Sequence, residues 1–174
     1  MRKAIQLFLD KDEELQSRIE SQMAPVLSRN LDLSLLAFRR SMPSIHSLLN
    51  KARQQKSSVY LNAAGEFDVV DYGSGNVLYG DNINQSVQRS VEQFISAPTH
   101  FKFRPETHNS QVDINTTSDT LIIMGLGLGL HLPQLMEAEL SFKHIIIYEP
   151  NFDYLVCSLY TGIWLSVFEI AKRN

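Results

Sequence analysis

The 174-residue sequence has one cysteine, one tryptophan and no apolar run long enough to cross a membrane. A lone cysteine, Cys157, excludes an internal disulfide and is compatible with a reducing compartment. The N-terminus has a basic start, but acidic residues from Asp10 onward interrupt it too early for a signal peptide. A membrane helix needs about 20 consecutive apolar residues, and no stretch reaches that length. We therefore expect a cytoplasmic protein without a membrane span.

The sequence also lacks a strong charge of either sign. Sixteen Lys and Arg residues against 19 Asp and Glu give a net charge of −3. The chain therefore lacks the excess of basic residues that is typical of nucleic-acid-binding domains. The five histidines show no ligand spacing with carboxylates or with Cys157, so we predict no metal site. Hydrophobic residues make up 44% of the chain and charged residues 20%, as in ordinary globular proteins. The length allows one or two domains with a sizeable core.

The most informative stretch, residues 119–151, contains an apolar run, a glycine-rich turn, a helical pattern and a second apolar run. It predicts five consecutive features: a strand at 121–124, a turn at Gly125, Gly127 and Gly129, a helix at 131–140, a strand at 145–148, and an acid at Glu149. Both strands are rich in Ile and Leu, which suits strands covered on both faces. Pro133 fits this pattern only in the first turn of the helix, where no N–H is needed. This order is typical of the start of a Rossmann-like domain.

A glycine-rich turn that leads into a helix presents backbone N–H groups to an anion or a polar ligand. Glu149, 20 residues after Gly129, lies where such folds bind ribose hydroxyls. Leu130 follows Gly129, so the pattern is G-x-G-x-G, which is less typical of NAD or FAD sites and closer to methyltransferase-like domains. A tight turn that binds nothing explains the glycines equally well.

We therefore predict a candidate ligand site without assigning a catalytic residue. Its possible ligand is a nucleotide or nucleotide-sugar, and no cofactor is certain. His131 is able to donate to a ligand there, although such a histidine more often caps a helix or packs. The candidate residues are Gly125, Gly127, Gly129, His131, Glu149 and Asn151.

The preceding part of the chain predicts mainly helices around a small sheet. Periodicity indicates helices at 3–23, at 31–42 and from Pro43 to about residue 54. Short β-prone runs at 59–61, 67–70 and 77–79 predict a three-stranded antiparallel meander. Asn82 is expected to cap a helix, with Gln85 completing a capping-box variant. A short strand is expected at 101–103. The acidic residues around the turns of the meander, Asp68, Asp71 and Asp81, are expected to be exposed to solvent.

After Glu149 the pattern predicts two short helices. Asn151 is expected to cap the first, whose buried side would comprise Phe152, Leu155, Val156 and Leu159. Cys157 beside them suits a structural thiol. Gly162 would end this helix before an apolar helical stretch at 164–170. With only two parallel strands in the sequence, we expect exposed apolar side chains at 160–172 and a homo-oligomer that covers them.

The predicted fold class is therefore mixed α/β. It comprises a helical N-terminus, a small antiparallel meander and the first two βα units of a Rossmann-like domain. We place an N-terminal α+β domain at residues 1–112 and the start of a truncated Rossmann-like domain at 113–174.

The pairing of IIMGLGLGLHLPQLM with IIIYEPN resembles the N-terminal region of the motility accessory factors. These are the Maf-type flagellin glycosyltransferases of bacteria, which are related to the archaeal hydroxymethylpterin pyrophosphokinase-like proteins. Members similarly place a G-x-G-x-G-x-H turn before an E-P-N or E-P-D element. The resemblance extends upstream over most of the chain, whereas the family's larger catalytic domain lies downstream of this region.

The resemblance implies a portion of an enzyme that O-glycosylates flagellin with a nonulosonic acid from a CMP-activated donor, as flagellar assembly and motility require. This portion would serve recognition or assembly, and its own enzymatic activity is uncertain. Two alternatives remain: an S-adenosylmethionine-dependent methyltransferase-like domain, with Glu149 on the ribose, and a ligand-free Rossmann-like interaction scaffold.

Overall fold

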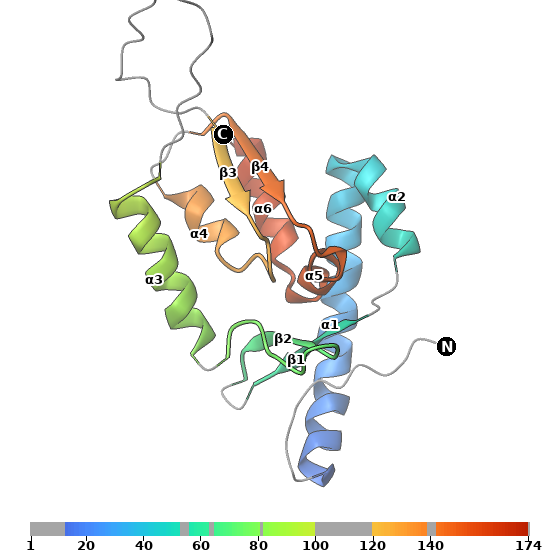
Figure 1. Cartoon of the computed structure of the whole chain (residues 1–174). Coiled ribbons are helices and arrows are strands. Elements are labelled where there is room, and N and C mark those ends of the chain that lie inside the picture. Colours follow the sequence, from blue (N-terminus) through green and yellow to red (C-terminus); the bar gives the residue numbers. More distant parts are fainter. Residues whose placement is uncertain are drawn as a thin grey trace, which may run out of the picture.

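The computed structural model describes residues 13–52, 56–62, 65–80, 82–99, 120–138 and 142–173. These residues form helices around one antiparallel and one parallel two-stranded sheet, which confirms the mixed α/β prediction (Figure 1). The elements are, in order, α1 (Glu13–Ser41), α2 (Pro43–Lys51), β1 (Ser57–Leu61), β2 (Phe67–Asp71), α3 (Ile83–Ser96), β3 (Thr120–Met124), α4 (Leu132–Glu137), β4 (His144–Tyr148), α5 (Phe152–Ser158), η1 (Leu159–Thr161) and α6 (Ile163–Arg173). The predicted strand at 101–103 lies outside the described residues.

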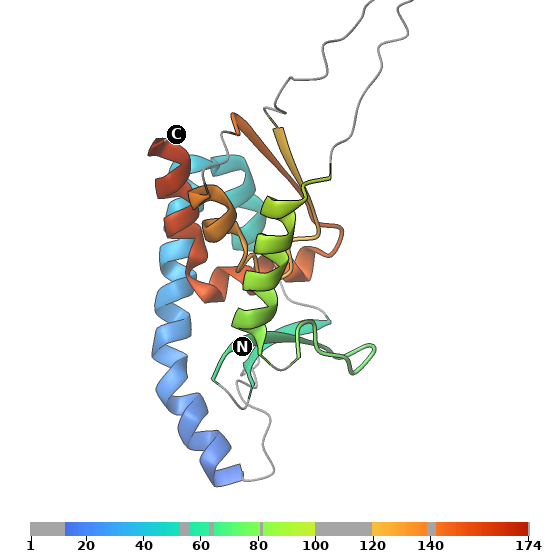
Figure 2. The same ribbon diagram turned by 90° about the vertical axis from the view of Figure 1, so that its left-hand side faces the viewer.

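Helix α1 is one continuous helix of 29 residues that includes Pro25. The prediction of two separate helices before Met42 is therefore wrong, and residues 3–12 lie outside the described range. A proline inside a helix removes one N–H donor and crowds the preceding turn. Tertiary contacts anchor the half of α1 after Pro25: Ser34 Oγ donates to the carbonyl of Leu159 at 2.8 Å, and Asn30 Nδ2 donates to that of Tyr160 at 2.9 Å. The N-terminal part of α1 projects beyond the other elements (Figure 2).

Helix α2 begins at Pro43, as predicted, and ends at Lys51. The preceding residue, Met42, has a φ of −141°, which agrees with the exclusion of residues before proline from the helical region.

Strands β1 and β2 pair antiparallel with Val59 opposite Val69. The predicted third strand is wrong in extent, because it is reduced to a single bridge between Val70 and Val77. Beyond this bridge the buried carboxylate of Asp68, on β2, takes the place of backbone partners by accepting from the N–H groups of Tyr79 at 3.0 Å and Gly80 at 2.8 Å. Asp68 is fully buried, so its assignment as a solvated turn acid is also wrong. Asp81 lies outside the described residues.

The start of α3 is capped by a carboxylate from a different element. Asn82 occupies the N-cap position with a φ of 60°, but its side chain makes no capping hydrogen bond. Glu66, from the turn before β2, accepts from the N–H groups of Ile83 at 2.8 Å and Asn84 at 3.1 Å. The predicted capping box of Asn82 and Gln85 is therefore wrong, because a residue 17 positions upstream satisfies the helix N-terminus.

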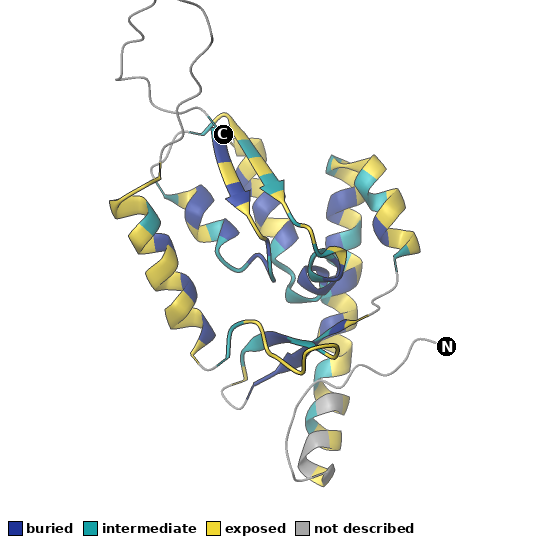
Figure 3. Ribbon diagram, in the orientation of Figure 1, coloured by how far each residue is buried: buried dark blue, intermediate teal, exposed yellow. Residues whose placement is uncertain are grey.

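Strands β3 and β4 form the predicted parallel pair, with Ile122 opposite Ile146. Among the described elements, α4 and α6 cover one face of this sheet and none covers the other (Figure 2). On the other face Met124 is 73% exposed and Tyr148 is 56% exposed. The alternating burial along β3 shows in Figure 3. The prediction of strands buried on both faces is therefore wrong for the described structure.

Pro133 lies in the first turn of α4, as predicted, but the helix spans Leu132–Glu137 rather than 131–140. Asn151 caps α5 as predicted, since its Oδ1 accepts from the N–H of Asp153 at 3.1 Å. Phe152 is 43% exposed, so it does not belong to the buried side of that helix.

Helix α6 packs its aromatic residues against α1. Trp164 is 4% exposed and Phe168 9%, and both contact the ring of Phe38, with centroids 4.7 and 5.1 Å away. The expectation of an exposed apolar surface at 160–172 is therefore wrong. The larger core joins α1, α2 and α3 to β3, α4 and α6. The predicted domain boundary at residue 112 falls outside the described residues and stays a prediction.

Candidate functional site

The glycine turn after β3 has the backbone geometry that its sequence predicts. Gly125, Gly127 and Gly129 all have positive φ, at 89°, 55° and 72°. A Cβ at Gly127 would lie 2.5 Å from Tyr79 Oη, and one at Gly129 would lie 2.6 Å from Ile163 Cδ1. At Gly125 a Cβ would meet nothing within 4 Å. The last two glycines thus allow close approach of neighbouring side chains as well as positive φ.

The carboxylate of Glu149 binds the backbone of this turn directly. Its Oε2 accepts from the N–H of Leu126 at 2.6 Å and from that of Gly127 at 3.2 Å, while Oε1 accepts from the N–H of Asn151 at 2.7 Å. The structure therefore brings Glu149 together with the glycines, as predicted. In the described state an internal carboxylate occupies the N–H groups that would otherwise face an anion.

Tyr79 holds the other side of the turn. Its Oη accepts from the N–H of Leu128 at 3.0 Å, and its own N–H donates to Asp68. Burial raises the pKa of the Tyr79 hydroxyl, with smaller contributions from the charges of Asp68 and Glu149, so the phenol stays protonated. The sequence analysis missed Tyr79 as a site residue, because a tyrosine in a short β-prone run carries no local signal of a contact 49 residues away.

Asn151 and Asp153 belong to the structural part of the site. Asn151 caps α5 and donates its N–H to Glu149. Asp153 is buried and accepts from the N–H groups of Lys56 at 2.7 Å and Ser57 at 3.1 Å, which fixes the start of β1 against α5. Val59, Val69, Leu128 and Cys157 pack together beneath the turn, in agreement with a structural role for this thiol. The antiparallel sheet and the glycine turn thus form one packed unit.

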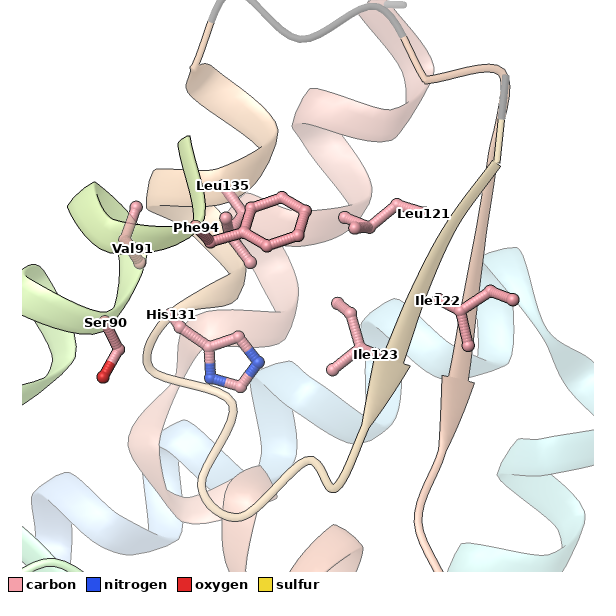
Figure 4. Close-up of a pocket in the computed structure, with 8 residues that line it drawn as sticks. All are labelled: Ser90, Val91, Phe94, Leu121, Ile122, Ile123, His131 and Leu135. Atoms are coloured by element: carbon pink, nitrogen blue, oxygen red, sulfur yellow. The ribbon is translucent and has the colours of Figure 1, made fainter. Parts of the chain in front are cut away.

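His131 lies apart from these polar contacts. Its ring faces an apolar cavity of about 190 Å³ between α3, β3 and α4 (Figure 4). Burial lowers the pKa of the imidazole, so the ring is neutral at pH 7. Within the described part of the chain no hydrogen bond to this ring is present. The structure therefore separates His131 from the glycines and Glu149, with which the sequence analysis had grouped it.

The described residues contain no group of three or more His, Cys, Asp or Glu side chains arranged to hold a metal ion. No single helix in the described part of the chain is long and apolar enough to span a membrane. Phe152–Thr161 and Ile163–Arg173 satisfy the length and hydropathy criteria only as a pair, bent by 89°.

The family comparison agrees with the resemblance found in the sequence. The family model described as glycosyltransferase Maf N-terminal domain matches residues 28–116 and 104–174. No curated protein and no solved structure matches the chain. The match includes α2, both sheets, the glycine turn and α6. The chain belongs to the family of glycosyltransferase Maf N-terminal domains.

Proposed function

We propose that this chain is the recognition and assembly portion of a Maf-type glycosyltransferase. In this proposal the enzyme acts in the cytoplasm and transfers a nonulosonic acid from a CMP-activated donor to flagellin, in support of flagellar assembly and motility. The observation that carries the proposal is the family match over residues 28–174. Catalysis would reside in another part of the enzyme.

The geometry around the glycine turn supports a role other than catalysis. The carboxylate of Glu149 and the hydroxyl of Tyr79 both accept from backbone N–H groups of the turn. The side chain of Asn151 caps α5. A general acid, base or nucleophile has to reach a substrate atom, whereas these groups hold the chain's own backbone.

A transfer assay tests this division of roles. The purified chain is incubated with flagellin and a CMP-activated nonulosonic acid, and the intact mass of flagellin is measured. We expect no mass gain, together with retention of flagellin on the immobilised chain. Addition of one sugar mass per acceptor would place the catalytic groups within residues 1–174. A lack of flagellin binding would contradict the recognition role.

A nucleotide or nucleotide-sugar at Gly125, Gly127, Gly129, Glu149 and Asn151 is a separate proposal. A ribose bound to Glu149 would compete with the N–H groups of Leu126 and Gly127 for the same carboxylate. Titration with cytidine monophosphate, followed by the amide NMR signals of Leu126 and Gly127, tests this competition. Saturable shifts of these two signals would support a nucleotide site, and unchanged signals at millimolar ligand would contradict it.

We also propose that homo-oligomer formation uses the outer face of the parallel sheet in place of residues 160–172. The outer face consists of Ile122, Met124, Ile146 and Tyr148, which are 45% to 73% exposed. Contiguous apolar surface of this kind marks interaction sites, and a second copy of the chain offers an identical apolar face.

Sedimentation tests this oligomer. We expect the unmodified chain to sediment as an oligomer. Ile146→Lys should shift the equilibrium toward monomer, because it places a charge in the contact. Leu48→Lys is the matched control, since Leu48 is similarly exposed, at 57%, but lies on α2. A monomeric unmodified chain, or equal effects of the two substitutions, would contradict the proposed contact.

A further inference from the structure

The cavity beside His131 uses neither Glu149 nor the glycines of the turn, and it borders the outer sheet face at Ile122. Phe94 and Val91 of α3 line one side, Leu121 and Ile123 of β3 line the opposite side, and His131 and Leu135 close the end at α4 (Figure 4). Ser90 borders the cavity from α3, and its hydroxyl already donates to the carbonyl of Ser86 at 2.9 Å. The imidazole is thus the main polar group that faces an otherwise apolar space.

The volume between the walls of the cavity indicates the size of the group that fits between them. A cavity of about 150 Å³ lined by Leu, Ile and Phe is large enough for benzene. The volume here is about 190 Å³, which suits one six-membered ring with a small substituent. Pockets for nucleotide-sized or drug-sized ligands usually span about 300 to 1,000 Å³.

The chemistry of the lining narrows the ligand class further. Among the described residues no charged side chain lines the cavity, so a carboxylate, phosphate or ammonium group would be desolvated without a partner there. A sugar would leave several hydroxyl groups unpaired for the same reason. An aromatic ring packs favourably beside Phe94. A single hydroxyl on that ring provides the hydrogen-bond partner that the His131 imidazole lacks within the described residues.

We propose that the cavity between α3, β3 and α4 binds a small neutral aromatic compound of the phenol class, with its hydroxyl hydrogen-bonded to His131. The apolar lining selects the ring, and the imidazole selects the hydroxyl. This site is independent of the proposed glycosyltransferase role, since it uses neither Glu149 nor the glycine turn.

Calorimetric titration with two probes of similar size tests the proposal. The probes are 4-methylphenol, which carries the hydroxyl, and toluene, which lacks it. We expect both to bind the unmodified chain. In His131→Leu the affinity for 4-methylphenol should fall about fivefold to tenfold, the change expected for one lost hydrogen bond, while the affinity for toluene should stay the same or rise. His46→Leu, on α2 and outside the cavity, should change neither affinity.

Two further variants locate the binding. Val91→Phe fills the cavity and should lower the affinity for both probes at least tenfold. Ser90→Trp, at an exposed position on the rim, should also weaken the binding of both probes. It replaces Val91→Phe as the test if Val91→Phe lowers the thermal midpoint of the protein. Absence of saturable binding to the unmodified chain would overturn the proposal. Binding that survives both variants would place the probes elsewhere, and an equal loss of both probes in His131→Leu would exclude the hydrogen bond.

Discussion

The glycine turn at Gly125–Gly129 and the cavity beside His131 are neighbours in the sequence but differ in how their polar groups are paired. The turn's N–H groups at Leu126, Gly127 and Leu128 all have acceptors from Glu149 or Tyr79. The His131 ring faces apolar side chains and has no hydrogen bond within the described part of the chain.

This difference changes where binding capacity is expected. A glycine-rich turn is the usual place to look for an anion, yet here an internal carboxylate holds it. A histidine after such a turn often caps a helix or packs, yet here its ring faces the apolar cavity. Hydrogen bonds within the chain already hold the N–H groups of the turn, whereas the His131 imidazole can pair with a ligand without losing a hydrogen bond to another described residue.

The largest expected effect is on the glycine turn. Gly127→Ala and Gly129→Ala each combine a positive φ with a Cβ closer than 3 Å to a neighbouring side chain. We expect each to lower the free energy of unfolding by about 2–4 kcal/mol, measured by urea denaturation. Gly125→Ala is the matched control, because it has the positive φ without the close contact, and about 1–2 kcal/mol is expected. Equal losses at all three positions would show that crowding plays no part.

The next effect concerns the internal carboxylate. Glu149→Ala leaves the N–H groups of Leu126, Gly127 and Asn151 without this acceptor, and we expect a loss of about 2–3 kcal/mol. Glu149→Gln keeps one oxygen acceptor and should cost about 1 kcal/mol. Urea denaturation measures both variants. If neither loses stability, the carboxylate is available to a ligand and the contrast between the two regions fails.

A smaller effect is expected from the hydroxyl of Tyr79. Tyr79→Phe keeps the ring but removes the acceptor for the N–H of Leu128, which should cost about 1 kcal/mol. Faster hydrogen exchange at the Leu128 amide, relative to the Leu132 amide in α4, is the specific readout. Unchanged protection at Leu128 would show that the hydroxyl does not hold the turn.

The smallest effect is a pH dependence from the cavity. Burial lowers the folded-state pKa of His131 below 6.5, so the unfolded chain binds a proton more readily over this window. The resulting stability is fully present above pH 6.5 and is lost as the pH falls toward the folded-state pKa. His131→Leu should therefore show a shallower decline in stability between pH 7.5 and 5.5, measured by thermal denaturation. Parallel pH profiles for the two proteins would contradict a lowered pKa of the partly buried imidazole.

Local sequence signals predicted the parts of the fold that depend on neighbouring residues. The three positive φ values follow from glycine itself, and Asn151 caps α5 through a bond two residues away. The parallel pairing of β3 and β4 follows from two apolar strands around a helix. The start of α2 at Pro43 follows from the restricted geometry of proline and of the residue before it.

The errors arose where a distant residue replaced the local partner. Glu66 caps α3 in place of Asn82, and Asp68 shortens the predicted third strand by binding the N–H groups of Tyr79 and Gly80. Helix α1 continues through the gap between the predicted helices at 3–23 and 31–42, and Asn30 and Ser34 bind the distant carbonyls of Tyr160 and Leu159, which periodicity does not reveal. The residue pattern of one strand does not reveal how many faces of a sheet other elements cover. The prediction of strands buried on both faces therefore did not anticipate the exposed outer face.

The sequence alone determined the order of elements from β3 to α6, the glycine turn and the family to which the chain belongs, because these depend on residue type and spacing. Only the tertiary structure decided how the candidate site residues are used. It joined Glu149 to the turn, added Tyr79 from 49 residues away and separated His131 into an apolar cavity. The physical reason is that a buried polar group takes the nearest available partner in space, and that partner is set by packing rather than by position in the chain.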